Sequence, residues 1–186
     1  MKQKTILGAT GRSPLLILLA IFFGAAPVAA EMVVQACFSP AGKCSSLIIR
    51  EIQQAKKELL VAVYAFTSDD LAAALVQAKK RGLSVQVVID RDFDAGNERS
   101  KGKFLEAQKV PLRRIAAIKS AAAEKEGGLM HQKFAVLDRS AILTGSYNWT
   151  HAADRLNDEN LLFFRDAGPL AEEYRRIFLQ LWERKN

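Results

Sequence analysis

The sequence predicts an α/β protein, a single domain in which a mixed β-sheet is sandwiched between helices. In the first half of the chain, apolar runs typical of strands alternate with helical patterns, and in the second half three strand-like runs follow one another. This order is typical of a mixed sheet with helices on both faces. The 156 residues from 31 to 186 are enough for one such domain with its own core.

The first half contains three expected strands, at 32–38, 59–66 and 83–90. The run 59–66 is continuously apolar, which is typical of a strand that is covered on both faces. The helix before it has an apolar face at spacings of three and four residues, formed by Ile48, Ile52, Ala55 and Leu59. The next helix is expected to begin after Ser68 and to end at Gly82.

The second half begins with an expected helix at 97–109, which Pro111 ends, and a short strand at 112–118. The charged segment 117–128 is the best candidate for a mobile loop. Three further strands are expected at 133–138, 141–146 and 160–166. The last helix buries one apolar face, formed by Leu170, Tyr174, Ile177, Phe178, Leu181 and Trp182.

The first 30 residues have the pattern of a secretory signal peptide. Three basic residues, at positions 2, 4 and 12, precede or flank the start of an apolar stretch at 14–30 that ends in small residues. We therefore expect cleavage after Ala30 and a periplasmic or secreted domain, 31–186, without stable membrane association. The alternative is a retained anchor, but 14–30 lies at the lower limit of the roughly 17–25 apolar residues that span a bilayer.

The chain has two cysteines, Cys37 and Cys44, which lie close together in the sequence. In an exported protein, such a pair most simply forms a disulfide that closes a small loop. Two unrelated buried thiols are the alternative. Because no catalytic group is adjacent in sequence, the expected role of the bridge is structural.

Most of the residues that can carry chemistry lie in the stretch 130–150, MHQKFAVLDRSAILTGSYNWT. Its pattern is His131-x-Lys133-x4-Asp138-x6-Gly145-Ser146, with Asn148 two residues further. His131 and Lys133 are two residues apart, so on an extended strand they project from the same face. The same period brings Ser146 and Asn148 to a common end of the next strand, and the four polar groups could converge on one small volume.

This stretch resembles the HKD motif of the phospholipase D superfamily, and residues 31–186 resemble its small single-motif branch, the Nuc-type bacterial endonucleases. The acidic segment NDEN at 157–160 matches the one that follows the family motif. The resemblance implies the phospholipase D/nuclease-like fold, no metal and no other cofactor. It implies a catalytic set of His131, Lys133, Asp138, Ser146, Asn148 and Glu159.

The resemblance also implies a role for each of these residues. His131 is the nucleophile, which attacks phosphorus and forms a phosphohistidine. Lys133 binds the non-bridging phosphate oxygens, and Ser146 and Asn148 donate hydrogen bonds to the same phosphate or position its neighbours. Glu159 accepts a hydrogen bond from the far nitrogen of the histidine and so fixes its tautomer.

Asp138 has the least certain place in this set, since it can orient Lys133 or the turn rather than touch substrate. Tyr147 and Trp149 are expected to pack beside the site rather than to stack on bases.

The leaving alkoxide needs a proton from a second group on the opposite side of phosphorus, and one imidazole cannot occupy both positions. The chain has one other histidine, His151, which lacks a Lys two residues on and is expected at the surface, at the start of a short helix. We therefore favour a second copy of His131, brought to the same phosphate by a two-fold homodimer.

Asp90, Asp92 and Asp94 follow an expected strand and form a competing site. Three carboxylates there could bind Mg²⁺ or Ca²⁺ for metal-assisted phosphoryl chemistry. The simpler interpretation is a solvated loop in which Asp94 caps the next helix.

The expected function is therefore that of a metal-independent phosphodiesterase that hydrolyses nucleic acid, DNA or RNA, with low sequence specificity. Without 1–30, which holds three basic and no acidic residues, the formal charge falls from +7 to +4, a mild bias toward anionic partners. Five basic residues are expected to help a groove track the backbone: Arg91, Lys101, Lys103, Arg113 and Arg114. The alternatives are a phospholipase D-type lipid phosphodiesterase and a non-catalytic nucleic-acid-binding module.

Overall fold

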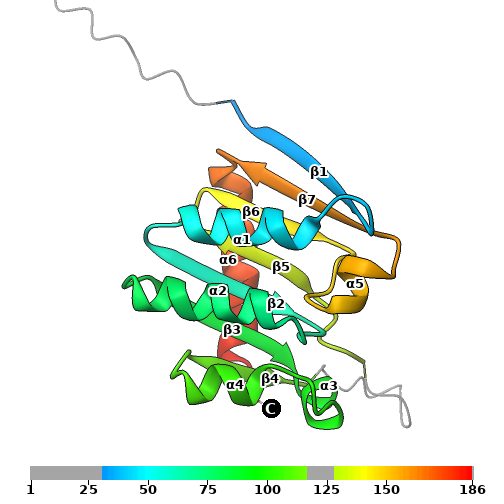
Figure 1. The fold of residues 1–186 in the computed structure, drawn as a ribbon. Helices are drawn as coiled ribbons and strands as arrows, with labels where there is room; N and C mark the ends of the chain where they lie inside the picture. The colour runs from blue at the N-terminus through cyan, green and yellow to red at the C-terminus, as the bar shows by residue number, and fades with distance from the viewer. Residues whose placement is uncertain (1–30, 117–127, 186) are drawn as a thin grey trace, which may run out of the picture.

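The computed structural model describes residues 31–116 and 128–185, which form one seven-stranded mixed sheet with the order β1-β7-β6-β5-β2-β3-β4 (Figure 1). The strands are β1 (Val33–Ser39), β2 (Glu58–Val63), β3 (Ser84–Asp90), β4 (Leu112–Ile115), β5 (Lys133–Leu137), β6 (Ala141–Gly145) and β7 (Glu159–Arg165). Strands β2, β3 and β4 are parallel to one another, and the other neighbours are antiparallel. The expected signal peptide and all but the last residue of the expected loop 117–128 lie outside the described residues.

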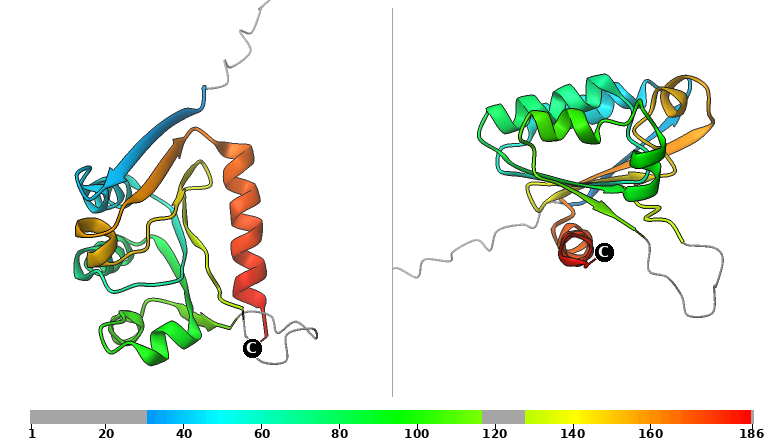
Figure 2. Two further views of the ribbon diagram at one scale, coloured as in Figure 1. Left: turned by 90° about the vertical axis from the view of Figure 1, so that its right-hand side faces the viewer. Right: turned by 90° about the horizontal axis from the view of Figure 1, so that it is seen from below.

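The helices are α1 (Cys44–Gln54), α2 (Asp69–Lys80), α3 (Arg91–Gly96), α4 (Gly102–Ala107), α5 (His151–Arg155) and α6 (Gly168–Glu183). Helices α1, α2 and α4 cover one face of the sheet, and α6 lies across the other (Figure 2). The predicted fold class, a mixed sheet between helices, is confirmed.

From Leu59 to Val63 the strand β2 is continuously apolar because both of its faces are buried. Leu59, Val61 and Val63 belong to the core under α1 and α2, whereas Leu60 and Ala62 belong to the core under α6. Because successive side chains of a strand point to opposite faces, both faces of β2 must be apolar. The run therefore places β2 at the centre of the sheet.

The helices and strands differ from the sequence-based expectation at several boundaries; for example, the strand expected at 59–66 ends at Val63. The helix expected at 97–109 is instead two short helices, α3 before it and α4 within it, because the carboxylate of Asp90 caps α3 directly at the end of β3 and Asn97 is extended. Leu59 does not belong to the face of α1, since this helix ends at Gln54 and Leu59 lies in β2.

Candidate active site

Most of the motif residues lie at one edge of the sheet, the edge at which β2 and β3 end. The directions of the strands explain this arrangement. The ends of β1, β2, β3 and β6 lie at the same edge as the beginnings of β5 and β7, because β5 and β7 run against their neighbours. His131 and Lys133 enter this edge at the start of β5 and Glu159 at the start of β7, while Ser146 and Asn148 leave it after β6.

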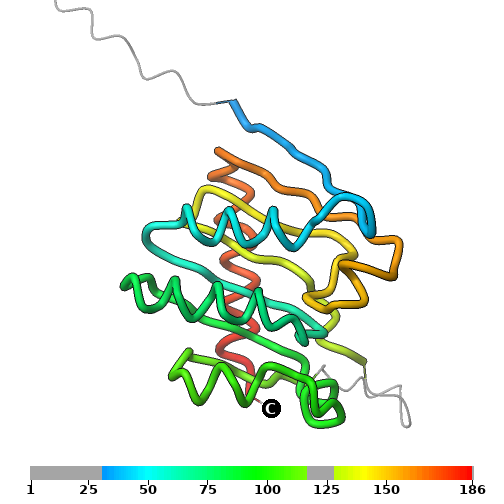
Figure 3. The backbone as a smooth tube through the Cα atoms, in the orientation of Figure 1, coloured from blue at the N-terminus to red at the C-terminus, as the bar shows by residue number. Residues whose placement is uncertain are grey.

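Backbone hydrogen bonds join the segment after β6 to the segment after β2. The backbone trace shows both segments at this edge of the sheet (Figure 3). The Trp149 carbonyl accepts hydrogen bonds from the backbone N–H groups of Thr67 and Ser68, and the Trp149 N–H donates to the Ala65 carbonyl. The Trp149 ring is buried and meets the Phe66 ring edge-on at 5.2 Å. Trp149 and Tyr147 are therefore packing residues, as expected, and they hold Asn148 between them.

His131 and Lys133 lie together at the start of β5. His131 is exposed, and Lys133 is half-buried and pairs with Val63 of β2. The Nζ atom of Lys133 donates a hydrogen bond of 3.0 Å to the backbone carbonyl of His131. The ring of Tyr64, the residue after β2, contacts both side chains: it is 4.8 Å from the imidazole and 5.3 Å from Lys133 Nζ.

Two opposing effects act on the pKa of Lys133. Burial lowers the pKa of Lys133 below its ordinary value, and the negative charge of Glu159 partly offsets this by raising it. Lys133 shares a sheet face with Ala135, and Glu159 shares the same face with Leu161. The ammonium and the carboxylate therefore project on one side of the sheet and interact there.

Ser146 and Glu159 form a connected pair. The Ser146 hydroxyl donates a hydrogen bond of 2.5 Å to Glu159 Oε2, and Asn157 Nδ2 donates to Glu159 Oε1 over 3.2 Å. Ser146 Oγ in turn accepts a hydrogen bond of 3.0 Å from the backbone N–H of Asn160. In the described part of the chain the Glu159 carboxylate makes no hydrogen bond to His131, so the expected contact between them is not formed here.

Gly145 makes this close arrangement of strands possible. A Cβ atom at this position would lie 2.3 Å from the Asn160 carbonyl oxygen, and the φ angle of +153° is rare for other residues. The glycine of the motif therefore allows the end of β6 to approach β7, which brings Ser146 to Glu159.

Asn148 carries a buried polar group with no partner. Its side-chain Oδ1 atom is shielded from solvent and makes no hydrogen bond to any described residue. A buried polar group without a partner costs about 1–3 kcal/mol, so such a group in a native protein calls for an explanation, and a catalytic or binding role is a common one.

Asp138 does not lie with the other motif residues. It follows β5 at the opposite edge of the sheet, and its carboxylate accepts hydrogen bonds of 2.7–3.0 Å from the backbone N–H groups of Lys56, Lys57 and Glu58. The expectation that it belongs to the catalytic set and orients Lys133 is corrected in favour of the other role, that of fixing the turn. Asp138 ties the chain between α1 and β2 to the turn between β5 and β6.

Asp90, Asp92 and Asp94 make separate contacts instead of forming one cluster; the segment after Asp90 is the short helix α3 rather than a loop, and Asp94 does not cap α4. Asp90 is buried and caps α3, Asp92 forms an ion pair with Arg91, and Asp94 binds Arg114 at 2.6 Å and accepts a hydrogen bond from Ser100. Within residues 31–116 and 128–185, no group of three or more His, Cys, Asp or Glu side chains could hold a metal ion.

Asp90 has a role that the sequence did not suggest. Its Oδ1 atom accepts hydrogen bonds from the N–H groups of Asp92 and Phe93, and its Oδ2 atom accepts one of 2.9 Å from Met130, the residue before His131. This buried contact crosses from β3 to the chain that enters β5. It fixes the backbone from which the imidazole projects.

His151 begins α5 and is exposed, as expected. Thr150 caps this helix by accepting a hydrogen bond from Ala153. None of the hydrogen bonds or ring contacts found among the described residues joins His151 to His131 or Lys133.

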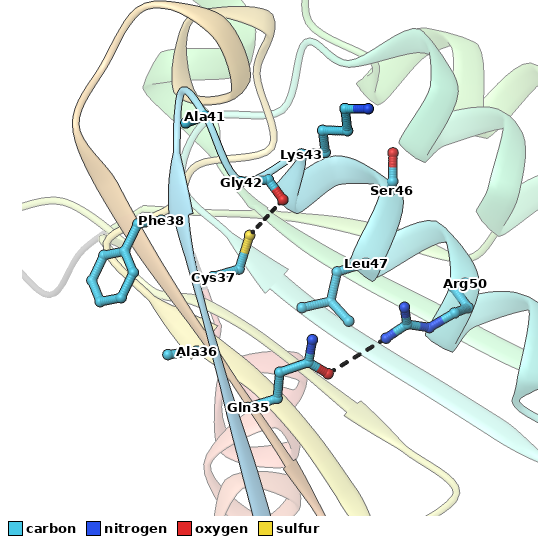
Figure 4. Close-up of a pocket in the computed structure, with 10 residues that line it drawn as sticks. All are labelled: Gln35, Ala36, Cys37, Phe38, Ala41, Gly42, Lys43, Ser46, Leu47 and Arg50. Carbon is cyan, nitrogen blue, oxygen red and sulfur yellow. Dashed lines mark hydrogen bonds between the residues drawn. The ribbon is translucent and has the colours of Figure 1, made fainter.

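The predicted disulfide between Cys37 and Cys44 is present and links the end of β1 to the start of α1. Beside it a groove of about 680 Å³ runs between β1 and α1, and Arg50 reaches across it to Gln35 (Figure 4). This groove is lined by none of the motif residues. It is therefore separate from the candidate active site.

Comparisons with known proteins show which family has this fold. The family model described as cardiolipin synthase, PLD-like domain, matches residues 48–182. A phospholipase D from Rickettsia felis is 31% identical over 149 residues, which are 80% of this chain and 67% of that protein. The mitochondrial cardiolipin hydrolase of Canis lupus familiaris is 35% identical over 149 residues, 80% of this chain and about half, 53%, of its own length.

Two solved structures share the whole architecture. Nuc from Salmonella typhimurium, a phospholipase D family member, has a TM-score of 0.72 and 30% identity, covering 82% of this chain and 95% of its own. NucT from Helicobacter pylori has a TM-score of 0.75 and 26% identity, covering 82% of this chain and 97% of its own.

The fold and the site thus define a phosphodiesterase. The chain belongs to the phospholipase D superfamily and resembles its Nuc-type members. No helix among residues 31–116 and 128–185 has the length and apolar character needed to cross a membrane.

Proposed function

We propose that this phosphodiesterase is an endonuclease that hydrolyses nucleic acid, without a metal ion, through a phosphohistidine on His131. One observation carries the proposal: an exposed imidazole stands beside a half-buried lysine whose charge is supported by Glu159. A phosphodiester bound at the Lys133 ammonium would lie within reach of a nucleophile, and Ser146 and Asn148 would complete its surroundings.

The reaction follows from these groups in two displacements. In the first, the free nitrogen of His131 forms a bond to phosphorus while the bond from phosphorus to one ester oxygen breaks, and a second imidazolium protonates that oxygen as it leaves. In the second, the same second imidazole accepts a proton from water, the water oxygen bonds to phosphorus, and the phosphorus–nitrogen bond breaks. His131 is regenerated and the product is a phosphomonoester.

The second imidazole would come from another copy of the chain. His151 is bonded to neither His131 nor Lys133, so within one protomer His131 has no such partner among the described residues. A two-fold axis beside this edge of the sheet would place two copies of His131 on opposite sides of one phosphorus atom. The enzyme would then be a homodimer with one shared active site.

A nucleic acid is favoured as substrate by the likeness to Nuc and by the exposed position of His131, which a phosphodiester within a long polymer can reach. The basic groove expected from the sequence stays a proposal, and several of its residues already have partners within the chain. Arg91 and Lys101 form ion pairs with aspartates, and Arg113 donates to main-chain carbonyls near the end of α6. Lys133 of the two protomers would therefore supply most of the phosphate contact.

A lipid phosphodiester is the second candidate, and the names of the relatives favour it. The chemistry at phosphorus would be the same. The two substrates are distinguished by incubating the protein, in the presence of a chelator, with plasmid DNA, with RNA and with vesicles of cardiolipin and phosphatidylcholine.

The test uses His131→Asn, with His151→Asn as the matched control. We expect the wild type and His151→Asn to cleave DNA in chelator, and His131→Asn to bind DNA but not to cut it. Cleavage of the vesicle lipid alone would show a phospholipase D-type enzyme instead of a nuclease. Loss of all activity in chelator would contradict the metal-independent mechanism. DNA binding without cleavage by the wild type would leave only a binding module.

We also propose that the chain is exported and acts in the periplasm or outside the cell. The pattern of residues 1–30 and the disulfide between Cys37 and Cys44 support this location. Mass determination of the protein recovered from the periplasmic fraction tests it, with a chain that begins at Glu31 as the expected result.

A further inference from the structure

Tyr64 is the one aromatic residue that contacts both His131 and Lys133 in the described structure. It follows β2 directly, where the backbones of β2 and of the chain entering β5 are still hydrogen-bonded to each other. Val63 pairs with Lys133, and the backbone N–H of Tyr64 donates a hydrogen bond of 2.8 Å to the Gln132 carbonyl. The backbone of Tyr64 is thus bonded to the residue between the two catalytic candidates.

The ring of Tyr64 lies among three other side chains. Its centroid is 4.8 Å from the centroid of the His131 imidazole, with the planes at 57°, and 5.3 Å from Lys133 Nζ. The Phe93 ring packs against it at 5.2 Å. Phe93 belongs to α3, which Asp90 caps, so the Tyr64 ring is held from the side of β3 as well.

No other side chain of the described residues contacts both His131 and Lys133, although the charge of Glu159 also acts on Lys133. The His131 ring is exposed and makes no hydrogen bond within the described residues, and Lys133 Nζ donates only to the backbone of His131 itself. A cation within about 6 Å of a tyrosine ring is attracted to its face, and an imidazole packs on the same kind of surface. The Tyr64 ring is therefore the side-chain contact that these two groups share.

We propose that Tyr64 is a positioning residue for the phosphodiester reaction: its ring holds the His131 imidazole and the Lys133 ammonium in a fixed relation to each other. This inference rests on the proposed function of the same site. A nucleophile and a phosphate-binding group must be aligned to within a fraction of an ångström, and misplacement by about 1 Å can cost about 100-fold in rate. The aromatic ring carries this role, and the hydroxyl group does not.

Two substitutions separate the ring from the hydroxyl, and a third is the control. Tyr64→Phe keeps the ring, Tyr64→Leu removes it, and Tyr174→Leu removes a half-buried tyrosine that packs on Phe134 at 5.1 Å on the other face of the sheet. The substrate is bis(4-nitrophenyl) phosphate, a small phosphodiester that reports the chemistry without depending on DNA or lipid recognition.

We expect Tyr64→Leu to lower kcat by about 10- to 100-fold while KM changes by less than about 3-fold, since alignment rather than binding is lost. Tyr64→Phe and Tyr174→Leu should stay within about 3-fold of the wild type in both constants. Full kcat in Tyr64→Leu would overturn the proposal, and so would an equal loss in Tyr64→Phe and Tyr64→Leu, because the ring would then not be the active feature.

A measurement without turnover keeps this inference separate from the proposed function. In the NMR spectrum we expect the ring current of Tyr64 to shift the ring protons of His131, which lies 4.8 Å away, and not those of His151, which has no ring contact among the described residues. We expect the His131 signals to move toward those of a free histidine in Tyr64→Leu but not in Tyr64→Phe, with the His151 signals unchanged. Unmoved His131 signals in Tyr64→Leu would overturn the proposal even if the chain proves to be a nuclease.

Discussion

The carboxylate of Asp90, at the end of β3, accepts a hydrogen bond of 2.9 Å from the backbone N–H of Met130. This buried contact joins the end of β3 to the chain just before β5, although β2 lies between these two strands in the sheet. It fixes the chain one residue before the nucleophile proposed for the reaction. The position of His131 thus depends on a residue 41 positions earlier in the sequence.

Substitution of Asp90 by Asn should therefore damage both the fold and the site. The amide group cannot accept hydrogen bonds on both sides, so the N–H of Met130 or those of Asp92 and Phe93 would be left buried and unpaired. We expect the free energy of unfolding to fall by about 1–3 kcal/mol and kcat to fall as well. Urea denaturation and hydrolysis of bis(4-nitrophenyl) phosphate measure the two effects.

The matched control for this substitution is Asp92→Asn, which removes a carboxylate that is largely exposed and forms an ion pair with Arg91. It should leave both quantities near the wild-type values. Equal losses in the two variants would contradict the special role of Asp90.

The alkaline limb of the pH–rate profile should report Lys133. Burial lowers the pKa of Lys133, and the charge of Glu159 opposes this shift. Removal of that charge in Glu159→Gln should lower the pKa further, so the ammonium is lost at a lower pH and the alkaline limb of kcat/KM moves in the same direction. Profiles normalised to their maxima remove any loss of overall rate.

Asp158→Asn is the control for this effect. Asp158 is the residue before Glu159, its side chain is exposed, and the substitution removes the same charge. Its alkaline limb should coincide with that of the wild type. A Glu159→Gln profile that is unmoved, or that moves to higher pH, would show that Lys133 does not govern this limb.

Asp138 should matter for stability and not for catalysis. Burial alone would raise the pKa of Asp138, but hydrogen bonds from the N–H groups of Glu58, Lys56 and Lys57 outweigh it, and the net shift is downward. A lowered pKa in the folded state means that the charged group stabilises the fold above the unfolded-state pKa of 3.8 and that this contribution is lost as the pH falls through the folded-state value.

Asp138→Asn should consequently lower the free energy of unfolding at pH 7 by about 1 kcal/mol, a modest value because solvent screens a partly exposed carboxylate. The difference from the wild type should shrink as the pH falls below about 4. Denaturation at a series of pH values measures it. A kcat at pH 7 reduced as strongly as in Lys133→Ala would instead return Asp138 to the catalytic set.

The disulfide should contribute to stability through the small loop that it closes. Cys37 and Cys44 are separated by 7 positions, and a loop of this size corresponds to about 2–3 kcal/mol in the chain-entropy description. We expect reductant to lower the free energy of unfolding of the wild type by this amount and to leave Cys37→Ser/Cys44→Ser unchanged. An identical response of both proteins would show that the bridge is not the cause.

Local patterns in the sequence predicted the fold class and placed His131, Lys133, Ser146 and Asn148 at one edge of the sheet, whereas Glu159 came from the family resemblance. Apolar runs set the strands, and a period of two sets which side chains share a face. The sequence left two roles open for Asp138, because the spacing of a motif does not reveal that β5 ends at the opposite edge of the sheet.

Other features depend on contacts between distant parts of the chain. Tyr64 reads as one more residue of an apolar run, and only the pairing of β2 with β5 brings it to His131. The hydrogen bond between Asp90 and Met130 likewise joins residues that are 40 positions apart in the sequence. The use of Lys101 and Arg113 in contacts within the fold is likewise invisible to composition, which counts charges but not their partners.

The most direct test of the proposed mechanism is to count the covalent intermediates. The protein is mixed with a short oligonucleotide, quenched at alkaline pH, where phosphohistidine survives, and examined by native and peptide mass spectrometry. We expect a dimer that carries one nucleotide adduct per two chains, attached to His131. An active monomer, or an adduct on each chain of a dimer, would contradict a site built from two copies of His131.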